Sequence, residues 1–149
     1  MRDETITLHD TRADELRAVY DMEQGEARSF IVPYTLERHQ EEFAKPAVTY
    51  KSIRRGEEVV GFVILALDPD GVSIEFRRIV VSVPGHGIGK AAVELVRELC
   101  KWELGRERVW LDVFESNERA RHVYEKCGYS RFGSADHGGR LLLLYETMA

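Results

Sequence analysis

A glycine-rich turn joins an apolar strand to a helix in the stretch VVSVPGHGIGKAA, residues 80–92. β-Branched residues precede the turn, and after it apolar residues recur at intervals of three and four, as in an amphipathic helix. Glycines at positions 85, 87 and 89 let the backbone approach a ligand and leave amide N–H groups unobstructed. The first turn of the helix adds unpaired N–H donors and the positive end of its dipole. The stretch therefore favours a site for an anion such as pyrophosphate, although glycines at these positions also suit a plain chain turn.

Two familiar phosphate-binding loops do not fit this turn. A Walker loop needs a serine or threonine after Gly-Lys to hold Mg²⁺, whereas Ala91 follows Lys90 here. The dinucleotide fingerprint, G-x-G-x-x-G, follows the first strand of a β-α-β unit, whereas here G-x-G-x-G follows three expected antiparallel strands. A Mg²⁺-dependent nucleotide binder is therefore disfavoured.

The chain as a whole predicts one α/β domain over residues 1–149, with a mixed, mostly antiparallel sheet flanked by about four helices. Strands at 48–54, 58–67 and 72–81 form an antiparallel meander, because the turn signal Asp68-Pro69-Asp70-Gly71 separates the last two. The other expected elements are a strand at 5–9, helices at 12–23, 35–44 and 117–127, a helix from 88 to a stop at Gly105, and strands at 108–114, 129–133 and 141–147, the last two joined by 136–139.

The composition bounds the kind of partner. With 26 Asp+Glu against 21 Lys+Arg, the net charge is −5, which argues against a nucleic-acid protein. No apolar run reaches the roughly 18–20 residues that span a bilayer, and the first residues carry no apolar signal segment, so we expect no membrane partner and a cytoplasmic protein. Cys100 and Cys127 lack metal-ligand spacing and indicate two buried thiols, so no metal site is expected.

A second pattern begins at Asn117, where the strand ending at Phe114 turns into a helix. Asn117 is the only asparagine of the chain and suits a helix N-cap. Tyr124 lies seven residues later on nearly the same helical face, where it suits either the core or a general acid. A phenol with a pKa of about 10 lies near enough to a departing thiolate, at about 8.5, to protonate it.

Together and in this order the two patterns resemble the GNAT superfamily of N-acetyltransferases over about residues 48–147. The superfamily's acetyl-CoA loop, Gln/Arg-x-x-Gly-x-Gly/Ala, is matched at residues 84–89. Its later motif, Asn-x-x-Ala-x-x-x-Tyr-x-x-x-Gly-Tyr/Phe, is matched by Asn117, Ala120, Tyr124, Gly128 and Tyr129. The loop departs at Pro84, which has neither an N–H nor a charge, and this puts one pyrophosphate contact in doubt. The run 74–80 looks most like the branch containing spermidine and ribosomal-protein alanine acetyltransferases.

The resemblance implies a single-domain GNAT-like fold and direct attack of an amine on acetyl-CoA. The backbone of Ile79, Val80 and Val81 would hydrogen-bond the pantetheine arm. Asn117 would contact the cofactor nearby, and Tyr124 would contact it and protonate the CoA thiolate. The pyrophosphate would be held by the amides of the loop, namely Gly85, His86, Gly87, Ile88, Gly89 and Lys90.

Two carboxylates are candidates for the base that deprotonates the amine. Glu75 and Asp112 stand on strands where related enzymes often place a carboxylate. Each also suits an ordinary role, as a solvated strand residue for Glu75 and as a backbone-bonded carboxylate for Asp112. His86, in the loop, and His122, on the polar face of its helix, are poorer candidates.

The acceptor implied by the resemblance is a primary amine, on a small molecule or a protein N-terminus. The segment 11–44 would shape its pocket. Four acidic residues of this segment could attract a cationic amine, namely Glu23, Glu26, Glu41 and Glu42. We favour the simpler interpretation that they form an acidic face in contact with solvent. A non-catalytic CoA-binding or sensing domain of the same fold is the alternative, and a homodimer is left open.

Overall fold

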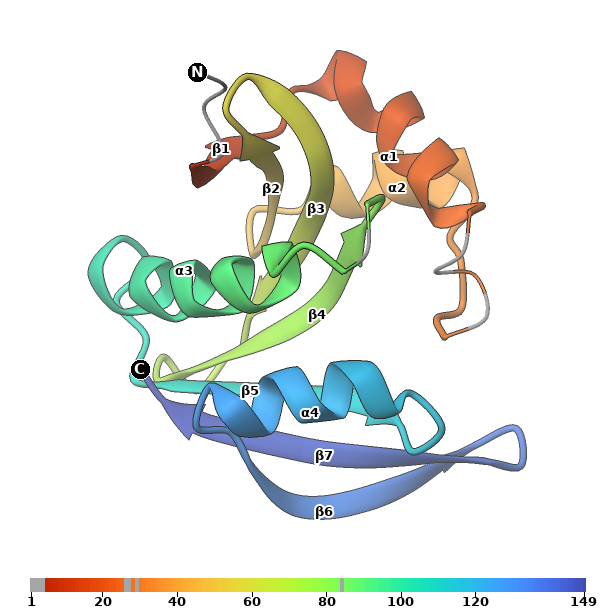
Figure 1. Ribbon diagram of the computed structural model, residues 1–149. Coiled ribbons are helices and arrows are strands. Elements are labelled where there is room, and N and C mark those ends of the chain that lie inside the picture. The colour runs from red at the N-terminus through yellow and green to blue at the C-terminus, as the bar shows by residue number, and fades with distance from the viewer. Residues whose placement is uncertain (1–4, 26–27, 29, 84) are drawn as a thin grey trace.

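The computed structural model describes residues 5–25, 28, 30–83 and 85–149. Within these ranges, one mixed seven-stranded sheet carries four α-helices, as the sequence predicted (Figure 1). The strands are β1 (Ile6–Asp10), β2 (Val48–Arg55), β3 (Glu58–Leu67), β4 (Ser73–Val81), β5 (Arg108–Phe114), β6 (Ser130–His137) and β7 (Arg140–Met148). The helices are α1 (Leu16–Glu23), α2 (Leu36–Phe43), α3 (Ile88–Trp102) and α4 (Glu118–Lys126), and a 3₁₀ turn at Ala13–Glu15 leads into α1.

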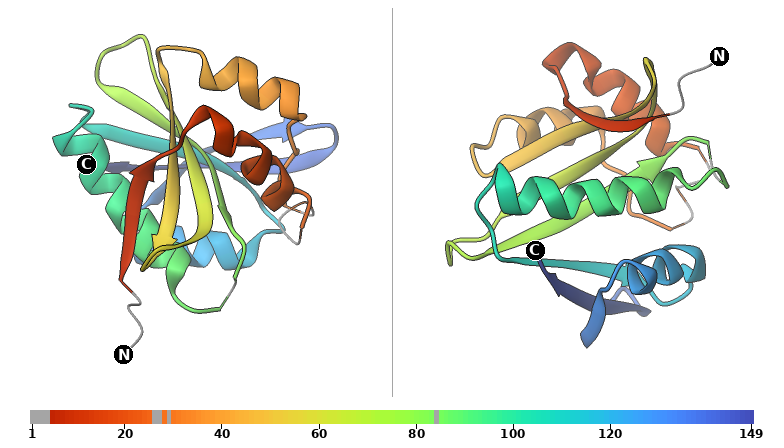
Figure 2. Two further views of the ribbon diagram at one scale, coloured as in Figure 1. Left: turned by 90° about the horizontal axis from the view of Figure 1, so that it is seen from above. Right: turned by 60° about the vertical axis from the view of Figure 1, so that its left-hand side comes forward.

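The sheet is covered on both faces. Its strands lie in the order β1-β2-β3-β4-β5-β7-β6, in which β4 and β5 are parallel and the other neighbours are antiparallel. Helices α1 and α2 pack on one face, where Leu16 and Val19 meet Phe62, and α3 and α4 pack on the other (Figure 2). Burial on both faces explains the unbroken apolar run of β3, because every residue from 60 to 66 is buried.

Strands β4 and β5 run side by side only where both begin. Their pairing joins Ser73–Glu75 to Arg108–Trp110. Farther along, Ile64 of β3 faces Arg78 and Leu65 faces Phe76, so Arg77 is the extra residue of a β-bulge. A bulge bends and twists its strand. The two strands accordingly diverge in Figure 1, and their separated ends frame the region in which the cavities described below lie.

Two expected elements have different boundaries in the structure. The helix expected at 12–23 begins with the 3₁₀ turn and becomes α-helical at Leu16. The strand expected at 129–133 runs from Ser130 to His137, so Asp136 and His137 belong to β6 and not to the connecting loop. All but one residue of β6 is exposed, so this strand lacks the alternation that marks a half-buried strand.

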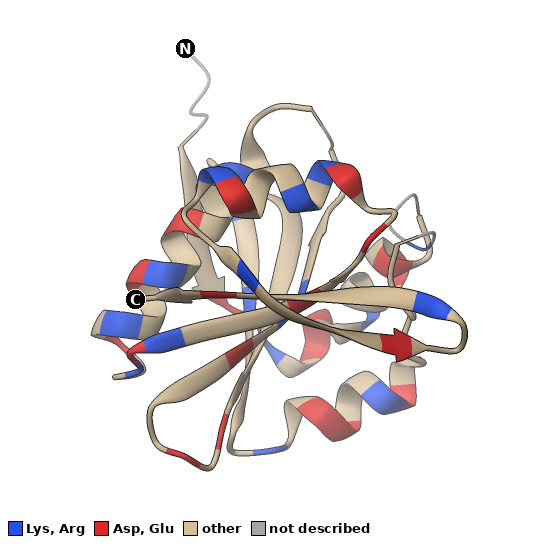
Figure 3. Ribbon diagram, turned by 90° about the horizontal axis from the view of Figure 1, so that it is seen from below, with Lys and Arg blue, Asp and Glu red and all other residues tan. Residues whose placement is uncertain are grey.

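Charges of both signs are spread over the helices and strands. Figure 3 shows Lys and Arg interspersed with Asp and Glu on the helices seen from below. Such a mixed surface is ordinary for a chain with a net charge of −5.

We predict that Gly61→Ala destabilises the protein, because β3 and β4 approach each other closely at this position. A Cβ atom at position 61 would lie 2.2 Å from the backbone oxygen of Val80. The strands would have to move apart, and we expect the free energy of unfolding to fall by about 1–3 kcal/mol in urea denaturation. Gly25→Ala is the matched control, since its Cβ would make an ordinary contact of 3.6 Å. Equal stability of the two variants would contradict the prediction.

Candidate active site

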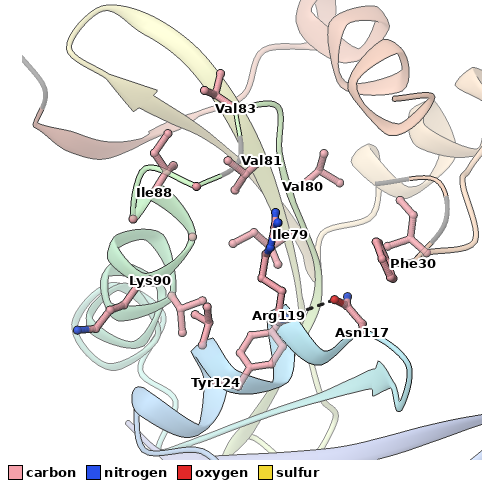
Figure 4. Close-up of a pocket in the computed structure, with 17 residues that line it drawn as sticks. Phe30, Ile79, Val80, Val81, Val83, Ile88, Lys90, Asn117, Arg119 and Tyr124 are labelled. Atoms are coloured by element: carbon pink, nitrogen blue, oxygen red, sulfur yellow. Dashed lines mark hydrogen bonds between the residues drawn. The ribbon is translucent and has the colours of Figure 1, made fainter. Parts of the chain in front are cut away.

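The larger cavity has a volume of about 450 Å³ and lies where the end of β4 meets the first turns of α3 and α4 (Figure 4). Ile79, Val80 and Val81 line it from β4, and Asn117 and Tyr124 line it from the α4 side. The other lining residues are Phe30, Ile31, Val83, Gly85, Gly87, Ile88, Gly89, Lys90, Val93, Arg119, Ala120 and Val123. The cavity therefore joins an apolar channel to the glycine-rich turn.

The glycine-rich turn leaves the start of α3 open. Gly85 and Gly87 have φ values of 85° and 71°, in the left-handed region that favours glycine. Gly87 is the N-cap of α3, and no hydrogen bond from a described side chain caps this end. The first N–H groups of a helix have no partner within it, so this turn presents donors at the border of the cavity. Pro84, where the expected loop pattern departs, lies outside the described residues.

A second cavity, of about 250 Å³, adjoins the first. The two share Ile79, Asn117 and Tyr124, together with Phe30, Ile31 and Ala120. The second cavity extends along the bulge of β4 toward β5, and its remaining lining is Val32, Phe76, Arg77, Arg78, Asp112, Val113, Phe114, His137 and Leu142. Ligands bound one in each cavity would therefore meet beside Tyr124.

Tyr124 is held by aromatic packing. Its ring lies 6.2 Å from that of Phe76 and 5.7 Å from that of Tyr129, and the residue is buried. Desolvation, and to a lesser degree the charge of Asp112, raises the pKa of Tyr124 well above its usual value. The phenol is therefore protonated at neutral pH and can donate a hydrogen bond or a proton.

The two carboxylates expected as bases lie in different surroundings. Asp112 lines the second cavity, where it stays exposed to solvent. Partial desolvation by the surrounding protein raises its pKa, while His137 and the arginines of β4 oppose the shift. Glu75 lies outside the described lining of both cavities and accepts a hydrogen bond of 3.1 Å from Nε of Arg77. Desolvation also raises the pKa of Glu75, against the opposing charge of Arg77. Of the two, Asp112 is the carboxylate within the site.

Asn117 has the expected capping role and also lies in the site. Its side-chain oxygen accepts a hydrogen bond of 3.3 Å from the backbone N–H of Ala120, which caps α4. At the other end of α4, Gly128 has a φ of 90° and follows the cap residue Cys127. The motif from Asn117 to Gly128 thus defines both ends of the helix that carries Tyr124.

The side chains of the remaining expected residues are not among the described lining of the two cavities. His86 and His122 are exposed and lie outside the described lining of either one. Cys100 and Cys127 are free and buried, and burial raises the pKa of Cys100 to about 12. Within the described ranges, no three His, Cys, Asp or Glu side chains gather as a metal site would need, and no helix is long and apolar enough to cross a membrane.

Comparison with known proteins identifies the family. The model of the acetyltransferase (GNAT) family matches residues 16–129. The chain belongs to this family. An uncharacterised N-acetyltransferase of Lactobacillus delbrueckii subsp. lactis is 30% identical over 99 residues, which make up 61% of this chain and 57% of that protein. The match thus spans little more than half the length of that relative.

Solved structures share the GNAT fold over nearly the whole chain. A spermidine N-acetyltransferase of Vibrio cholerae in complex with CoA and spermine is 18% identical, with a TM-score of 0.81 and coverage of 96% of this chain and 95% of that one. An aminoglycoside acetyltransferase in complex with coenzyme A is 20% identical, with a TM-score of 0.80 and coverage of 97% and 95%. At these identities the likeness establishes the fold.

A buried ionic network lies beside the second cavity. It shows that the expectation of a solvated acidic face is wrong for two of the four glutamates. Glu23 is fully buried and bonds both His39 and Arg78. His39, also buried, bonds the hydroxyl of Tyr50 at 2.8 Å. Glu42 is 2% exposed and bonds Arg77 at 2.7 Å. These two glutamates are internal partners of the arginines, because the bulge of β4 turns both arginines toward α1 and α2.

The other two glutamates give different outcomes. Glu41 is exposed, as expected. Glu26 lies outside the described residues. The difference between Glu41 and Glu42 follows from adjacent positions on α2, which point about 100° apart, so one faces solvent and the other faces the sheet.

Arg78 fixes one wall of the second cavity. It donates a hydrogen bond of 2.8 Å to the backbone oxygen of Val32, and its guanidinium lies 4.2 Å from the ring centroid of Tyr34. Glu23 also accepts a hydrogen bond of 3.2 Å from the backbone N–H of Tyr34. Val32 and Tyr34, which lie between α1 and α2, are thereby tied to β4. Two adjacent arginines within a strand that is mostly apolar were the available signal for buried acidic partners.

We predict that Glu23→Ala strongly destabilises the GNAT domain, because it leaves His39 and Arg78 without their carboxylate. Breaking a buried ion pair from one side typically removes about 3–5 kcal/mol of stability. Urea denaturation of Glu23→Ala beside the exposed control Glu41→Ala measures the loss. If both variants unfold at the same urea concentration, the network does not contribute as described.

Proposed function

We propose that this GNAT protein transfers the acetyl group of acetyl-CoA to a primary amine by direct attack. The observation that carries the proposal is the meeting of two cavities at Tyr124, one bordered by the glycine-rich turn and the other containing Asp112. Acetyl-CoA supplies an activated thioester. We assign acetyl-CoA to the larger cavity and the amine to the second cavity. Two structural neighbours were solved in complex with CoA, one of them also with spermine, which supports a site for each ligand in this fold.

The larger cavity fits the cosubstrate. The ladder between β4 and β5 ends at Glu75, so the backbone of Ile79–Val81 is available to an extended pantetheine arm. Val83, Ile88 and Val93 provide apolar contact along the channel. The amides of the turn, from Gly85 to Lys90, would hold the pyrophosphate at the start of α3.

Tyr124 is the general acid in this proposal. As the carbon–sulfur bond breaks, the electron pair stays on sulfur and the phenol donates its proton to that sulfur. Burial raises the pKa of Tyr124, so the phenol keeps its proton until a strongly basic group such as the departing thiolate forms beside it. The phenol recovers its proton from solvent.

Asp112 is the group that accepts the proton lost by the attacking amine, directly or through one water molecule. It lies in the second cavity, which we call the acceptor cavity, and its raised pKa makes it a stronger base than an ordinary aspartate. Glu75, the other candidate, is engaged by Arg77. Asn117 would contact the cofactor where the cavities join.

The setting of this activity is also a proposal. Two free, buried thiols suit a reducing compartment, and we place the protein in the cytoplasm on that basis. A homodimer stays a prediction, to be measured by light scattering.

We predict that Tyr124→Phe lowers kcat about 10²- to 10⁴-fold, because the thiolate loses its proton donor. CoA-thiol release measures kcat, and calorimetry measures CoA binding, which should change less than threefold. Tyr129→Phe is the control, since it is a neighbouring buried tyrosine outside the described lining of both cavities. Unchanged transfer by Tyr124→Phe across the pH range would exclude the general acid. A wild type that binds CoA but acetylates no amine would favour a CoA-sensing domain.

We predict that Asp112→Asn removes one ionisation from the acid limb of the pH profile of kcat/KM. In the wild type both Asp112 and the amine must lose a proton, so kcat/KM falls more steeply below the raised pKa of Asp112. The variant should lose about 100-fold in rate and show the ionisation of the amine alone. Glu75→Gln should retain the steeper limb. The reverse result for the two variants would assign the base to Glu75.

A further inference from the structure

The acceptor cavity carries more positive than negative groups. Among the described residues that line it, Asp112 provides the one carboxylate, whereas Arg77 and Arg78 provide two guanidiniums. His137 adds an imidazole, which is neutral or cationic. An acceptor with several amines would therefore place a second cation in a cavity with two arginines.

The acidic residues near the cavity balance charge on the arginines, but they offer no direct contact to a ligand. Glu23 and Glu42 are 0% and 2% exposed, so a bound molecule cannot reach them. Glu75 bonds Arg77 and lies outside the described cavity lining. These carboxylates lie behind the arginines and orient them, while the guanidiniums form part of the cavity wall.

The arginines that line the cavity keep some unused hydrogen-bond donors. A guanidinium has five N–H donors. Nε and Nη1 of Arg77 bond Glu75 and Glu42, and Nη2 of Arg77 also lies 3.1 Å from the Glu75 carboxylate. Nη1 and Nη2 of Arg78 bond Glu23 and the Val32 carbonyl. These bonds use only some of the donors and hold both planes in fixed positions. Fixed guanidiniums with free N–H groups are the usual partners of a carboxylate or a phosphate.

We propose that the acceptor is a small amine that also bears an anionic group such as a carboxylate. Its amine lies at Asp112 and its anion lies against Arg77 and Arg78. The inference rests on the proposed function of the same site. It separates this protein from polyamine acetylation, the activity for which several of its structural neighbours, the spermidine N-acetyltransferases, are named. A cavity of about 250 Å³ suits a molecule of amino-acid size.

The test compares acceptors that differ only in one charge. α-Amino acids and ω-amino acids are each assayed beside the corresponding amide and the corresponding amine without the carboxylate, with spermidine as the polyamine, by CoA-thiol release. We expect kcat/KM for the best amino acid to exceed that for its amide at least about tenfold, and spermidine to be the poorest acceptor. Spermidine or an amide that matches the amino acids would overturn the inference and leave the proposed function standing. No transfer to any amine would overturn both.

An arginine variant ties the preference to the cavity. Arg77→Gln should raise KM for the amino acid about tenfold and leave KM for the amide unchanged, so that the preference for the carboxylate narrows. Arg17→Gln is the control, because Arg17 is exposed on α1 and pairs with Asp21 on the surface. A variant that weakens both acceptors equally would show a structural role for Arg77 and overturn its role in anion recognition. The wild-type comparison decides the substrate class even if Arg77→Gln fails to fold.

Discussion

The early end of the ladder between β4 and β5 is the constraint on which the candidate site depends. After three paired positions the bulge at Arg77 bends β4 away, and the backbone of the rest of the strand becomes free on that side. A continuous ladder would close the space now occupied by both cavities. The larger cavity runs along the unpaired part of β4, and the second cavity extends toward β5. One extra residue in one strand thus creates a place where two ligands can meet.

The same bulge explains why charged groups are buried between β4 and the helices α1 and α2. It turns Arg77 and Arg78 toward α1 and α2, where Glu42 and Glu23 meet them. Burying these charges is expensive, and hydrophobic residues of the same size would give an equal or greater stability. The network instead fixes the segment between α1 and α2 against β4. The ion pairs therefore contribute to the fixed position of the cavity wall, which is a separate property from the stability of the domain.

The sequence predicted those parts of the fold that have local causes. The turn at 85–89, the amphipathic α3 and both ends of α4 follow from glycines, a capping asparagine and a period of 3.6 residues, all within short windows. The length of β6 was wrong because an exposed strand has no alternating pattern. The burial of Glu23 was missed because its partner Arg78 lies 55 residues away. The bulge has no local signal either, and without it the lining of the acceptor cavity by Phe30 and Ile31 could not be derived from the sequence.

The start of α3 leaves backbone N–H groups without a side-chain partner in the ligand-free protein. The residue that precedes the first turn of a helix is preferentially a serine, threonine, aspartate or asparagine, whose side chain accepts a hydrogen bond from an exposed N–H group. Here Gly87 occupies that position and offers no side chain, so the helix is left without an internal cap. A serine or threonine at position 87 would be strained at the φ of 71°, so the chain does not supply a capping hydroxyl there. The first N–H groups of this helix are therefore left to water or to a bound ligand.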